Sequence, residues 1–325
     1  GGGPAGVIAA LAAMRGGAAV SIIEKSTFPR HKVCGEFLSP AIFKVIERAG
    51  CGETFLKCHP AVLREMRLHF GTRVIRRKLP EPAYGLSRYE LDLLLLDHAI
   101  ASGAKLVRER WSTSPDGTNI ILATGRKSIA NSAVRLFGFK AHFRGPVNDA
   151  VELYFFRNCY VGVSAIQSGA TNVCGLAPEG ILRSFGFQPD AFLESHAPLT
   201  ERMRPLTRTM DWLMTGPLVF SERFSHDSES AVYRAGDALG FIDPFTGSGI
   251  LNAMLSGELA GKAAAHGTSP ETYVHDCRRL FRRPFLVSSA FRAAIASGHA
   301  GLLASLLPGS LLFHATRPAA SSIGA

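Results

Sequence analysis

The sequence of 325 residues contains 46% hydrophobic and 19% charged residues, which predicts a globular chain that forms one large domain or two intergrown ones. Its 36 Lys and Arg residues outnumber 26 Asp and Glu residues and give a formal net charge of +10, which favours anionic partners. Nucleic acid is not expected as a partner, because no recognition-helix, RNP or zinc-finger pattern accompanies the basic residues.

The cysteines and the apolar stretches indicate where the protein works. Six cysteines show neither a C-x-x-C pair nor a metal-ligand spacing with the 11 histidines, so we expect free thiols, a reducing cytoplasm and no metal site. The longest apolar stretch, 301–313, is broken by Pro308 and is too short to span a membrane. We therefore expect a cytoplasmic protein, with peripheral contact to a membrane as the alternative.

The chain opens with GGGPAG, in which Gly1, Gly3 and Gly6 have the spacing of a dinucleotide-binding fingerprint. Glycines at these positions permit a tight turn and let the backbone approach a pyrophosphate at the N-terminus of a helix. No strand precedes Gly1 in the sequence. We expect the strand that normally leads into such a loop to lie upstream, or another segment to fill the centre of the sheet.

The residues after this loop predict a helix and a buried strand. Apolar residues from Val7 to Leu11 share one helical face, Gly16 and Gly17 end the helix, and 18–23 is an apolar run. Glu24 follows this strand, 18 residues beyond Gly6. A carboxylate in that place binds the ribose hydroxyls of an adenine dinucleotide in this type of fold.

Further along, the pattern predicts alternating elements followed by a region rich in strands. A helix is expected over 40–49, a hairpin over 62–79, a helix over 87–103 and strands over 104–109 and 120–125. Short runs punctuated by Gly and Asn predict a β-sheet from 140 to 178. A helix over 191–203, a strand over 216–220, a strand, loop and helix over 231–265 and helices from 278 onward complete the expected order.

This order predicts an α/β nucleotide-binding domain that carries a sheet-based substrate domain. A second glycine-rich signature supports it. RAGDALG at 234–240 reads as a strand that ends in a Gly-Asp turn, and DPFTGSG at 243–249 leads into a helix. Backbone amides at the start of that helix make a site for an anion or an electron-rich ring edge.

Together these motifs resemble the flavin-dependent reductases and hydroxylases with the para-hydroxybenzoate hydroxylase fold, most closely the geranylgeranyl reductase-like branch. The resemblance covers nearly the whole chain and is carried by five ordered motifs, namely GGGPAG, Glu24 with FPRHKVCGE, Ser87-Arg88 with Leu91-Asp92, ILATG, and GDALGFIDPFTGSGI. It implies a Rossmann-like FAD-binding domain of the hydroxylase type, an inserted β-sheet substrate domain and C-terminal helices.

The resemblance also implies domain boundaries and cofactor-binding residues. The FAD-binding domain would comprise 1–60, 83–135 and 224–280, the substrate domain 61–82 and 136–223, and the C-terminal helical segment 281–325. The residues implied to bind FAD are Gly1, Gly3, Gly6, Glu24, Lys25, Arg88, Gly125, Gly236, Asp237, Pro244, Gly247, Ser248 and Gly249. Among them, Arg88 would face the phosphates, Asp237 would bind the ribityl chain, and the amides of 247–249 would meet the pyrimidine edge of the flavin.

Cys34 and three residues of the substrate sheet complete the expected site. Cys34 matches a loop that lies close to the isoalloxazine ring in this branch, and it is the candidate catalytic residue, with a packed, inert thiol as the alternative. Arg30, His31 and Lys32 would lower its pKa if they lie close. The expected substrate pocket contains Phe155, Tyr160 and Gly162.

Two departures from the family pattern concern the substrate and the adenine end of FAD. The family usually has a Tyr-x-Trp motif followed by an apolar residue and Pro, whereas this chain has YVGVSA at 160–165, with Gly162 in place of the Trp. A prenyl-chain substrate and halogenation are therefore less favoured. Between Arg108 and Ile120, about ten polar residues replace the small β-meander of the family.

The resulting hypothesis is an FAD-dependent oxidoreductase that reduces a double bond of an apolar small molecule, or hydroxylates it with oxygen. NAD(P)H or a protein donor would supply electrons by docking transiently, because no second dinucleotide fingerprint is present. The alternative is a truncated, non-catalytic chain that binds lipid or a partner through basic C-terminal helices, with Arg278 to Arg283 followed by Phe285, Leu286, Phe291 and a Leu-rich tail.

Other polar residues are not expected to form a site. Ser225, His226 and Asp227 are neighbours in the sequence, whereas a catalytic triad is assembled from separated positions. The isolated histidines His98, His142 and His196 are expected to be packing or surface residues.

Overall fold

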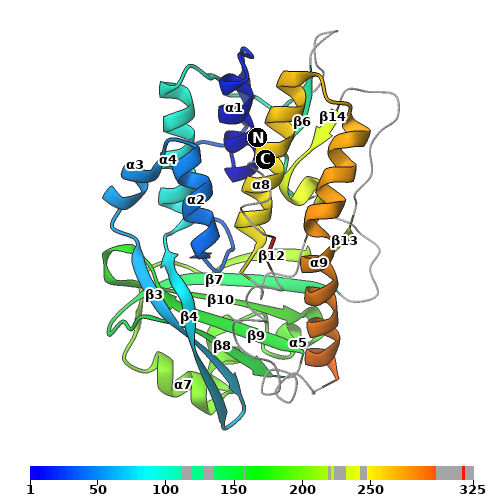
Figure 1. Ribbon diagram of the computed structural model, residues 1–325. Coiled ribbons are helices and arrows are strands. Elements are labelled where there is room, and N and C mark those ends of the chain that lie inside the picture. The colour runs from blue at the N-terminus through cyan, green and yellow to red at the C-terminus, as the bar shows by residue number, and fades with distance from the viewer. Residues whose placement is uncertain are drawn as a thin grey trace.

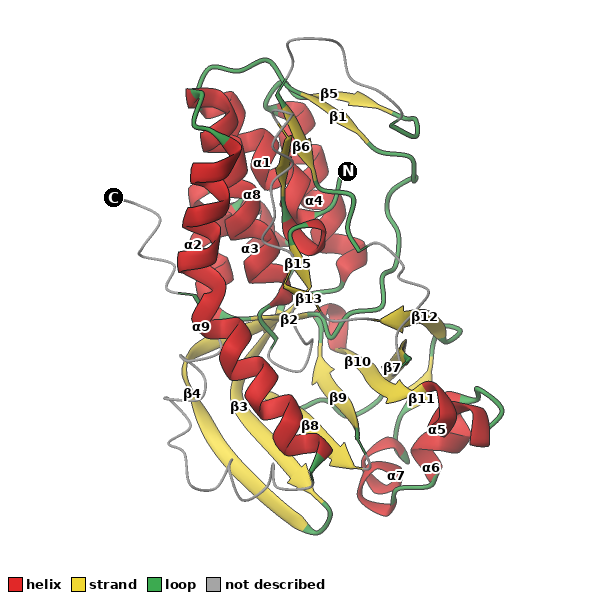
Figure 2. Cartoon of the chain, turned by 90° about the vertical axis from the view of Figure 1, so that its right-hand side faces the viewer, coloured by secondary structure: helices red, strands yellow, loops and turns green. Residues whose placement is uncertain are grey.

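The computed structural model describes residues 1–111, 119–126, 135–156, 158–218, 221–222, 232–241, 247–297 and 317–318. A group of helices with short parallel strands lies above a large mixed β-sheet, and helix α9 runs along both (Figures 1 and 2). The upper layer contains α1 (Pro4–Arg15), α2 (Pro40–Arg48), α3 (Gly52–Lys57), α4 (Arg88–Ala101), α8 (Gly249–His266) and α9 (Pro270–Ala296).

Two separate parallel ladders accompany these helices. Strand β1 (Ser21–Ile23) pairs with β5 (Lys105–Val107), and β6 (Ile120–Leu122) pairs with β14 (Val232–Arg234). A further short pair joins β13 (Ser221–Glu222) to β15 (Gly240–Phe241). Among the described residues no strand connects the two parallel ladders, so β1 and β6 each have one unpaired edge.

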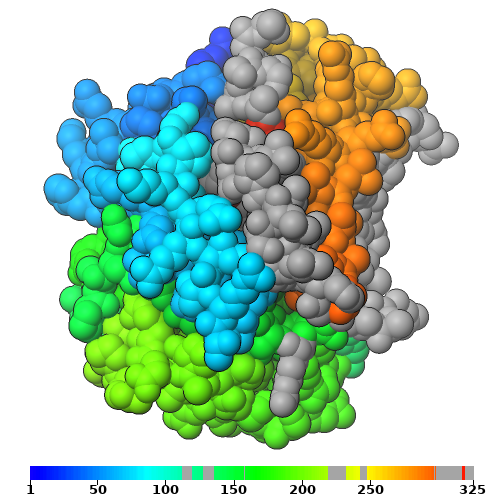
Figure 3. Space-filling model, turned by 60° about the horizontal axis from the view of Figure 1, so that its bottom comes forward, coloured from blue at the N-terminus to red at the C-terminus, as the bar shows by residue number. Residues whose placement is uncertain are grey.

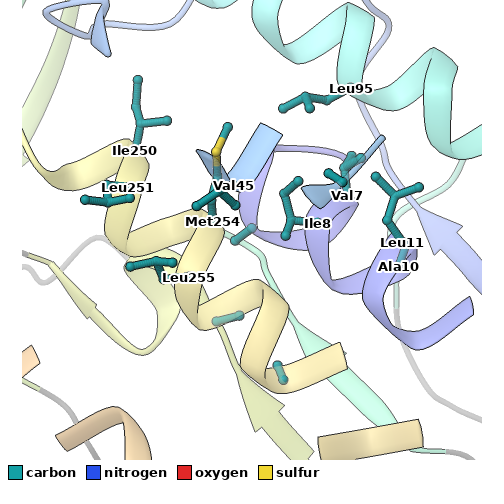
Figure 4. Packing of buried hydrophobic residues seen from close by; sticks show 14 of the residues in the cluster. Val7, Ile8, Ala10, Leu11, Val45, Leu95, Ile250, Leu251, Met254 and Leu255 are labelled. Carbon is teal, nitrogen blue, oxygen red and sulfur yellow. The ribbon is translucent and has the colours of Figure 1, made fainter. Parts of the chain in front are cut away.

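Small residues let α1 and α8 pack with their backbones close together. A Cβ atom at Gly257 would overlap the carbonyl oxygen of Ala5, and one at Gly261 would overlap that of Ala9. Around this crossing, side chains of α1 and α8 point toward one another, with Val45 of α2 and Leu95 of α4 beside them (Figure 4). Glycine is therefore required on α8 by the closeness of the two helices.

The lower layer is a 9-stranded sheet with the order β11-β7-β10-β9-β8-β3-β4-β2, in which β12 also pairs with β7. Its strands are β2 (Phe37–Leu38), β3 (Ala61–Phe70), β4 (Arg73–Gly85), β7 (Leu136–Arg144), β8 (Ala150–Phe156), β9 (Cys159–Ala165), β10 (Ala170–Pro178), β11 (Thr207–Arg208) and β12 (Leu213–Leu218). All pairs are antiparallel except β3 with β8.

The two faces of this sheet have different neighbours. One face carries Phe139, Ala141, Val161 and Val173, and it packs against the short helices α5 (Glu179–Ser184), α6 (Pro189–Glu194) and α7 (Ala197–Met203). The opposite face is turned toward the helical layer, because side chains alternate along each strand. This second face forms the floor of the cavity described below.

The sequence predicted most elements of this fold. The helix expected over 40–49 is α2, the hairpin is β3–β4, and the helix expected over 87–103 is α4. The prediction was wrong at 191–203, where α6 ends at Glu194 and α7 begins at Ala197. Pro198 lies in the first turn of α7, where proline is tolerated, and it could not continue a helix from α6. The domain boundaries stay a prediction.

Candidate functional site

A cavity of about 1590 Å³ lies between the helical layer and the sheet. It is lined by the glycine loop at Gly1–Gly6, by the ends of β1 and β6, by the loop of Cys34 and by the inward face of the sheet. Ligand pockets commonly measure ~300–1,000 Å³, so this cavity has room for more than one small molecule.

The glycine loop is held between the ends of two strands. The backbone N–H of Gly2 donates to Glu24 Oε2 at 2.8 Å, just after β1. A Cβ atom at Gly6 would overlap the carbonyl oxygen of Gly1, so the loop needs glycine there. At Gly3 a Cβ atom would meet nothing within 4 Å, and Gly3 lines the cavity. The open space at Gly3 lies at the N-terminus of α1, where backbone amides favour a phosphate.

Glu24 is buried at the junction of the loop and β1. Burial raises its pKa, but hydrogen bonds from the backbone N–H groups of Gly2 and Ser26, together with the charge of Arg30, hold it below the ordinary value of 4.5. Arg30 Nη2 lies 3.4 Å from Glu24 Oε2. Glu24 is thus an anion that lines the cavity, as a ribose-binding carboxylate requires, and the adjacent Lys25 is exposed along the same cavity.

A second set of expected cofactor residues lines the cavity from the other ladder. Gly125 follows β6 with φ +74°, and Gly236 follows β14 with φ +64°, so both adopt the left-handed conformation that favours glycine. Asp237 is exposed to the cavity but surrounded by protein. This desolvation raises its pKa, although the positive charges of Arg88, Arg126 and Lys32 act to lower it.

The N-terminus of α8 supplies the remaining part of the second signature. Gly247 has φ +63° and lines the cavity together with Gly249, while Ser248 is buried as the residue before α8. Pro244 lies outside the described residues. The residues expected to bind FAD that the structure describes therefore line one cavity, except Ser248, which lies beside it. Their roles toward FAD stay predictions.

Arg88 lies at the start of α4 and lines the cavity. Its guanidinium forms a two-pronged ion pair with the buried Asp92, at 2.5 Å and 2.7 Å. The pKa of Arg88 is raised overall. Burial acts to lower it, but the charge of Asp92 and the hydrogen bonds to Asp92 raise it more. This pairing fixes the guanidinium beside the cavity as a permanent cation.

The floor of the cavity is apolar at one end. Phe155, Tyr160 and Gly162, the expected substrate residues, all line the cavity from β8 and β9. Phe291 of α9 packs against Phe155, with ring centroids 6.1 Å apart. A Cβ atom at Gly162 would make an ordinary contact of 3.4 Å with Leu153, so this position is open enough for a small side chain.

Beside the other end of the floor is a buried polar cluster that the sequence analysis did not single out, and one of its residues, Glu36, lines the cavity. The cluster comprises Glu36, Lys140 and His142. Glu36 and Lys140 are both fully buried and form an ion pair, while His142 Nε2 lies 2.7 Å from Glu36 Oε2. His142 was expected to be an isolated packing or surface residue, and instead it contacts Glu36. The available signal was a Lys and a His two residues apart in an apolar strand, FGFKAHF.

Cys34 lines the cavity beside this cluster. Burial raises its pKa, and the opposing charges of Arg88 and Lys140 do not reverse the shift. Burial thus outweighs the nearby cations, and the charges that act against it come from Arg88 and Lys140. A neutral thiol beside the cavity fits contact with a ligand better than nucleophilic attack.

The described residues form neither a metal-binding cluster nor a membrane-spanning helix. No cluster of three or more His, Cys, Asp or Glu side chains within the described ranges has the arrangement to hold a metal ion. Among the helices that the structure describes, none is long and apolar enough to cross a membrane.

The fold was compared with known proteins. No protein-family model and no curated protein matches the sequence. The flavin-dependent brominase Bmp2 superposes with a TM-score of 0.80 over 95% of this chain and 89% of its own, at 16% identity. A flavoprotein/dehydrogenase from Cytophaga hutchinsonii gives 0.78 over 97% and 89%, at 18% identity. CmlS, a flavin-dependent halogenase, gives 0.75 over 98% of this chain and 66% of its own, at 21% identity.

These identities are too low to carry an activity across, but the similarity extends over nearly the whole chain. The expected α/β fold with a mixed sheet is thereby confirmed. The chain has the fold shared by FAD-dependent halogenases and hydroxylase-type flavoproteins.

Proposed function

We propose that the protein is an FAD-dependent oxidoreductase that acts on an apolar small molecule. The observation that carries this proposal is that one continuous cavity is lined both by the glycine loop at Gly1–Gly6 and by the apolar floor at Phe155 and Tyr160. FAD and the substrate would both lie in this cavity, so that the flavin ring would contact the substrate. The fold similarity to flavin-dependent enzymes supports the choice of FAD.

The residues present fit FAD on the evidence of their own geometry. The free space at Gly3 would take the pyrophosphate, and the Glu24 carboxylate would accept a hydrogen bond from the adenosine ribose. Asp237 would accept one from the ribityl chain. The amides at the start of α8, around Gly249, would donate to the pyrimidine edge of the ring.

When bound, the flavin supplies hydride or electron transfer, and the protein supplies position and electrostatics. The floor residues Phe155, Tyr160 and Leu176 would hold an apolar substrate and exclude water from its reacting part. We infer that NAD(P)H or a protein donor reduces the flavin by transient docking, since the sequence has no second dinucleotide fingerprint. The family branch suggests an isoprenoid-like or polyketide-like substrate, and the open wall at Gly162 argues against a narrow prenyl channel.

Turnover with and without oxygen separates the two reactions that this frame supports. The FAD-loaded chain is incubated with NADH, NADPH or a reduced ferredoxin and a panel of apolar small molecules, in air and under argon. Product formed only in air indicates hydroxylation, and product formed under argon indicates reduction of a double bond. A bound flavin that none of these donors reduces would contradict the proposed function.

One observation favours the alternative hypothesis, in which the chain binds an acidic lipid surface through its basic C-terminal helix. Arg278, Arg279, Arg282 and Arg283 are exposed along α9, which lies on the molecular surface together with the β3–β4 hairpin (Figure 3). Of the apolar residues that membrane attachment would use, Phe285 and Phe291 are buried and Leu286 is exposed, while the Leu-rich tail lies outside the described residues. Sedimentation with acidic liposomes at low and high salt tests this, since purely electrostatic attachment is lost on screening.

A further inference from the structure

Glu36, Ser164 and Cys174 line the cavity at the end opposite Phe155 and make that end polar. Strand register places Lys140 opposite Cys174 and His142 opposite Asn172, and Asn172 opposite Ser164. These residues share the face that carries Tyr160 and Phe155 further along the strands, because side chains alternate. A molecule lying on this floor would thus have its apolar body at one end and a polar group at the other.

Glu36 closes the polar end from above. It lines the cavity, its side chain is fully buried, and its backbone is in the left-handed region with φ +53°. A non-glycine residue rarely adopts this conformation, and such strain is typical of functional positions. Lys140 and His142 hold the pKa of Glu36 below its ordinary value, although burial raises it, so the carboxylate is an anion at neutral pH.

The hydrogen bonds of Glu36 leave part of its acceptor capacity unused. A carboxylate offers about four acceptor positions on its two oxygens. Oε1 accepts from Lys140 Nζ and from the backbone N–H of Arg88, at 2.6 Å for the latter, and Oε2 contacts His142. Nearby, the buried Asn172 donates through Nδ2 to the Cys34 carbonyl at 3.1 Å, while its Oδ1 has no partner among the described residues. The Glu36 carboxylate is therefore an anchored acceptor at the polar end, and Asn172 lies buried beside it, outside the cavity lining.

We propose that Glu36 is a specificity-determining residue that accepts a hydrogen bond from an O–H or N–H group of the substrate. Lys140 and His142 position the carboxylate and keep it ionised, and the sheet floor holds the apolar body of the same molecule. The role of Glu36 in catalysis rests on the proposed function, whereas the hydrogen bond between Glu36 and a bound molecule does not require flavin chemistry.

The test compares two probes that differ in one donor, 2-naphthol and 2-methoxynaphthalene, by equilibrium dialysis at neutral pH with and without FAD. A hydrogen bond to a charged acceptor predicts that the wild-type chain binds 2-naphthol at least about 10-fold more tightly. Glu36→Gln should reduce this preference to less than about 3-fold. Glu152→Gln is the matched control, because Glu152 is a buried carboxylate held by Arg202, and its neighbour Val151 lies on the cavity face, so Glu152 faces the other side of the sheet.

The outcomes separate the two proposals. Equal affinities of the wild-type chain for the two probes, or no binding of 2-naphthol, would overturn the role of Glu36 even if Glu36→Gln fails to fold. Equal loss of preference in Glu36→Gln and Glu152→Gln would also overturn it. Retention of FAD with equal affinities leaves the oxidoreductase proposal standing. A clear preference for 2-naphthol without retention of FAD supports the role of Glu36 as an acceptor and gives no support to the flavin function.

Discussion

Gly3 and Gly6 belong to one motif but meet different surroundings, so substitution by Ala separates folding from cofactor binding. Gly3 has φ −81° and open space at its Cβ position, so Gly3→Ala should fold with a change of only ~0.5 kcal/mol in unfolding free energy. Its methyl group would occupy the space proposed for the pyrophosphate and weaken FAD binding by about 10-fold or more. Thermal melts and FAD titration measure the two effects.

Gly6→Ala provides the contrast to that variant. Its methyl group would overlap the carbonyl of Gly1, so the loop must shift, and we expect a lower melting temperature as well as lost FAD binding. If Gly3→Ala destabilises the chain as much as Gly6→Ala, the free space at Gly3 is not a cofactor cradle.

Buried carboxylates predict how stability depends on pH. The pKa values of Glu36 and Glu24 are lower in the folded chain than the ordinary value of 4.5, so the native state binds fewer protons than the unfolded state. Their contribution is present above pH 4.5 and is lost as the pH falls through the folded pKa values. The melting temperature should therefore fall steeply in acid below that pH.

Glu36→Gln should show a shallower fall, since it removes one of the two titrating groups. Asp237 acts in the opposite sense, because its pKa is raised and its ionisation opposes folding as the pH rises. Melts of the wild-type chain and Glu36→Gln between pH 7 and pH 3 provide the comparison, and identical acid profiles would exclude a titrating role of Glu36.

At the scale of elements, the contact between α1 and α8 is limited by the size of its residues. Gly257→Ala would force the two helix backbones apart, because the added Cβ overlaps the Ala5 carbonyl, and overpacking of this kind costs about 1–3 kcal/mol. The melting temperature should drop by several degrees. Gly180→Ala is the control, since Gly180 lies in α5 with nothing within 4 Å of its Cβ position. A drop of equal size in the control would contradict this explanation.

The unpaired edges of β1 and β6 border the same cavity, and their backbone groups could pair with an additional strand. Glu24 follows β1 and contacts Gly2, while Ala123 follows β6 and its carbonyl lies against Gly1. A segment joined to Gly1 would therefore pass between the two strands and run parallel to both. We expect an added segment of about five apolar, β-branched residues to pair with both edges.

This prediction is tested by comparing melting temperature and FAD retention between chains with two different additions. An extension rich in Val and Ile should raise both, and one rich in Gly and Asp should raise neither, because it cannot bury apolar side chains in the slot. Equal values for the two extensions would show that the slot does not accept a strand.

The accuracy of the sequence-based predictions depended on how local each signal is. The glycine loop and Glu24 were identifiable because their spacing follows from one helix and one strand. The Glu36 cluster was not, because Lys140 and His142 lie 104 and 106 positions from Glu36 and meet it only through strand pairing. Likewise the break between α6 and α7 depends on one proline in a region that otherwise has helical character.

At the scale of the molecule, the cavity lies between two layers that contribute different groups. The helical layer contributes glycine turns, helix N-termini and charged groups such as Arg88, while the sheet contributes a floor that changes from apolar at Phe155 to polar at Ser164 and Cys174. Under the proposed function, both layers are needed to bring a nucleotide cofactor and an apolar substrate together. Solved flavin-dependent enzymes share the fold of this chain.

The measurement that tests the central claim most directly is the visible absorption spectrum of the purified chain after incubation with FAD and desalting. It is recorded beside Gly3→Ala and beside the chain with the apolar strand extension. We predict flavin absorbance close to one FAD per chain in the extended protein, less in the unextended one, and little in Gly3→Ala. Absence of flavin from both the unextended and the extended chain would contradict the assignment of this cavity to FAD.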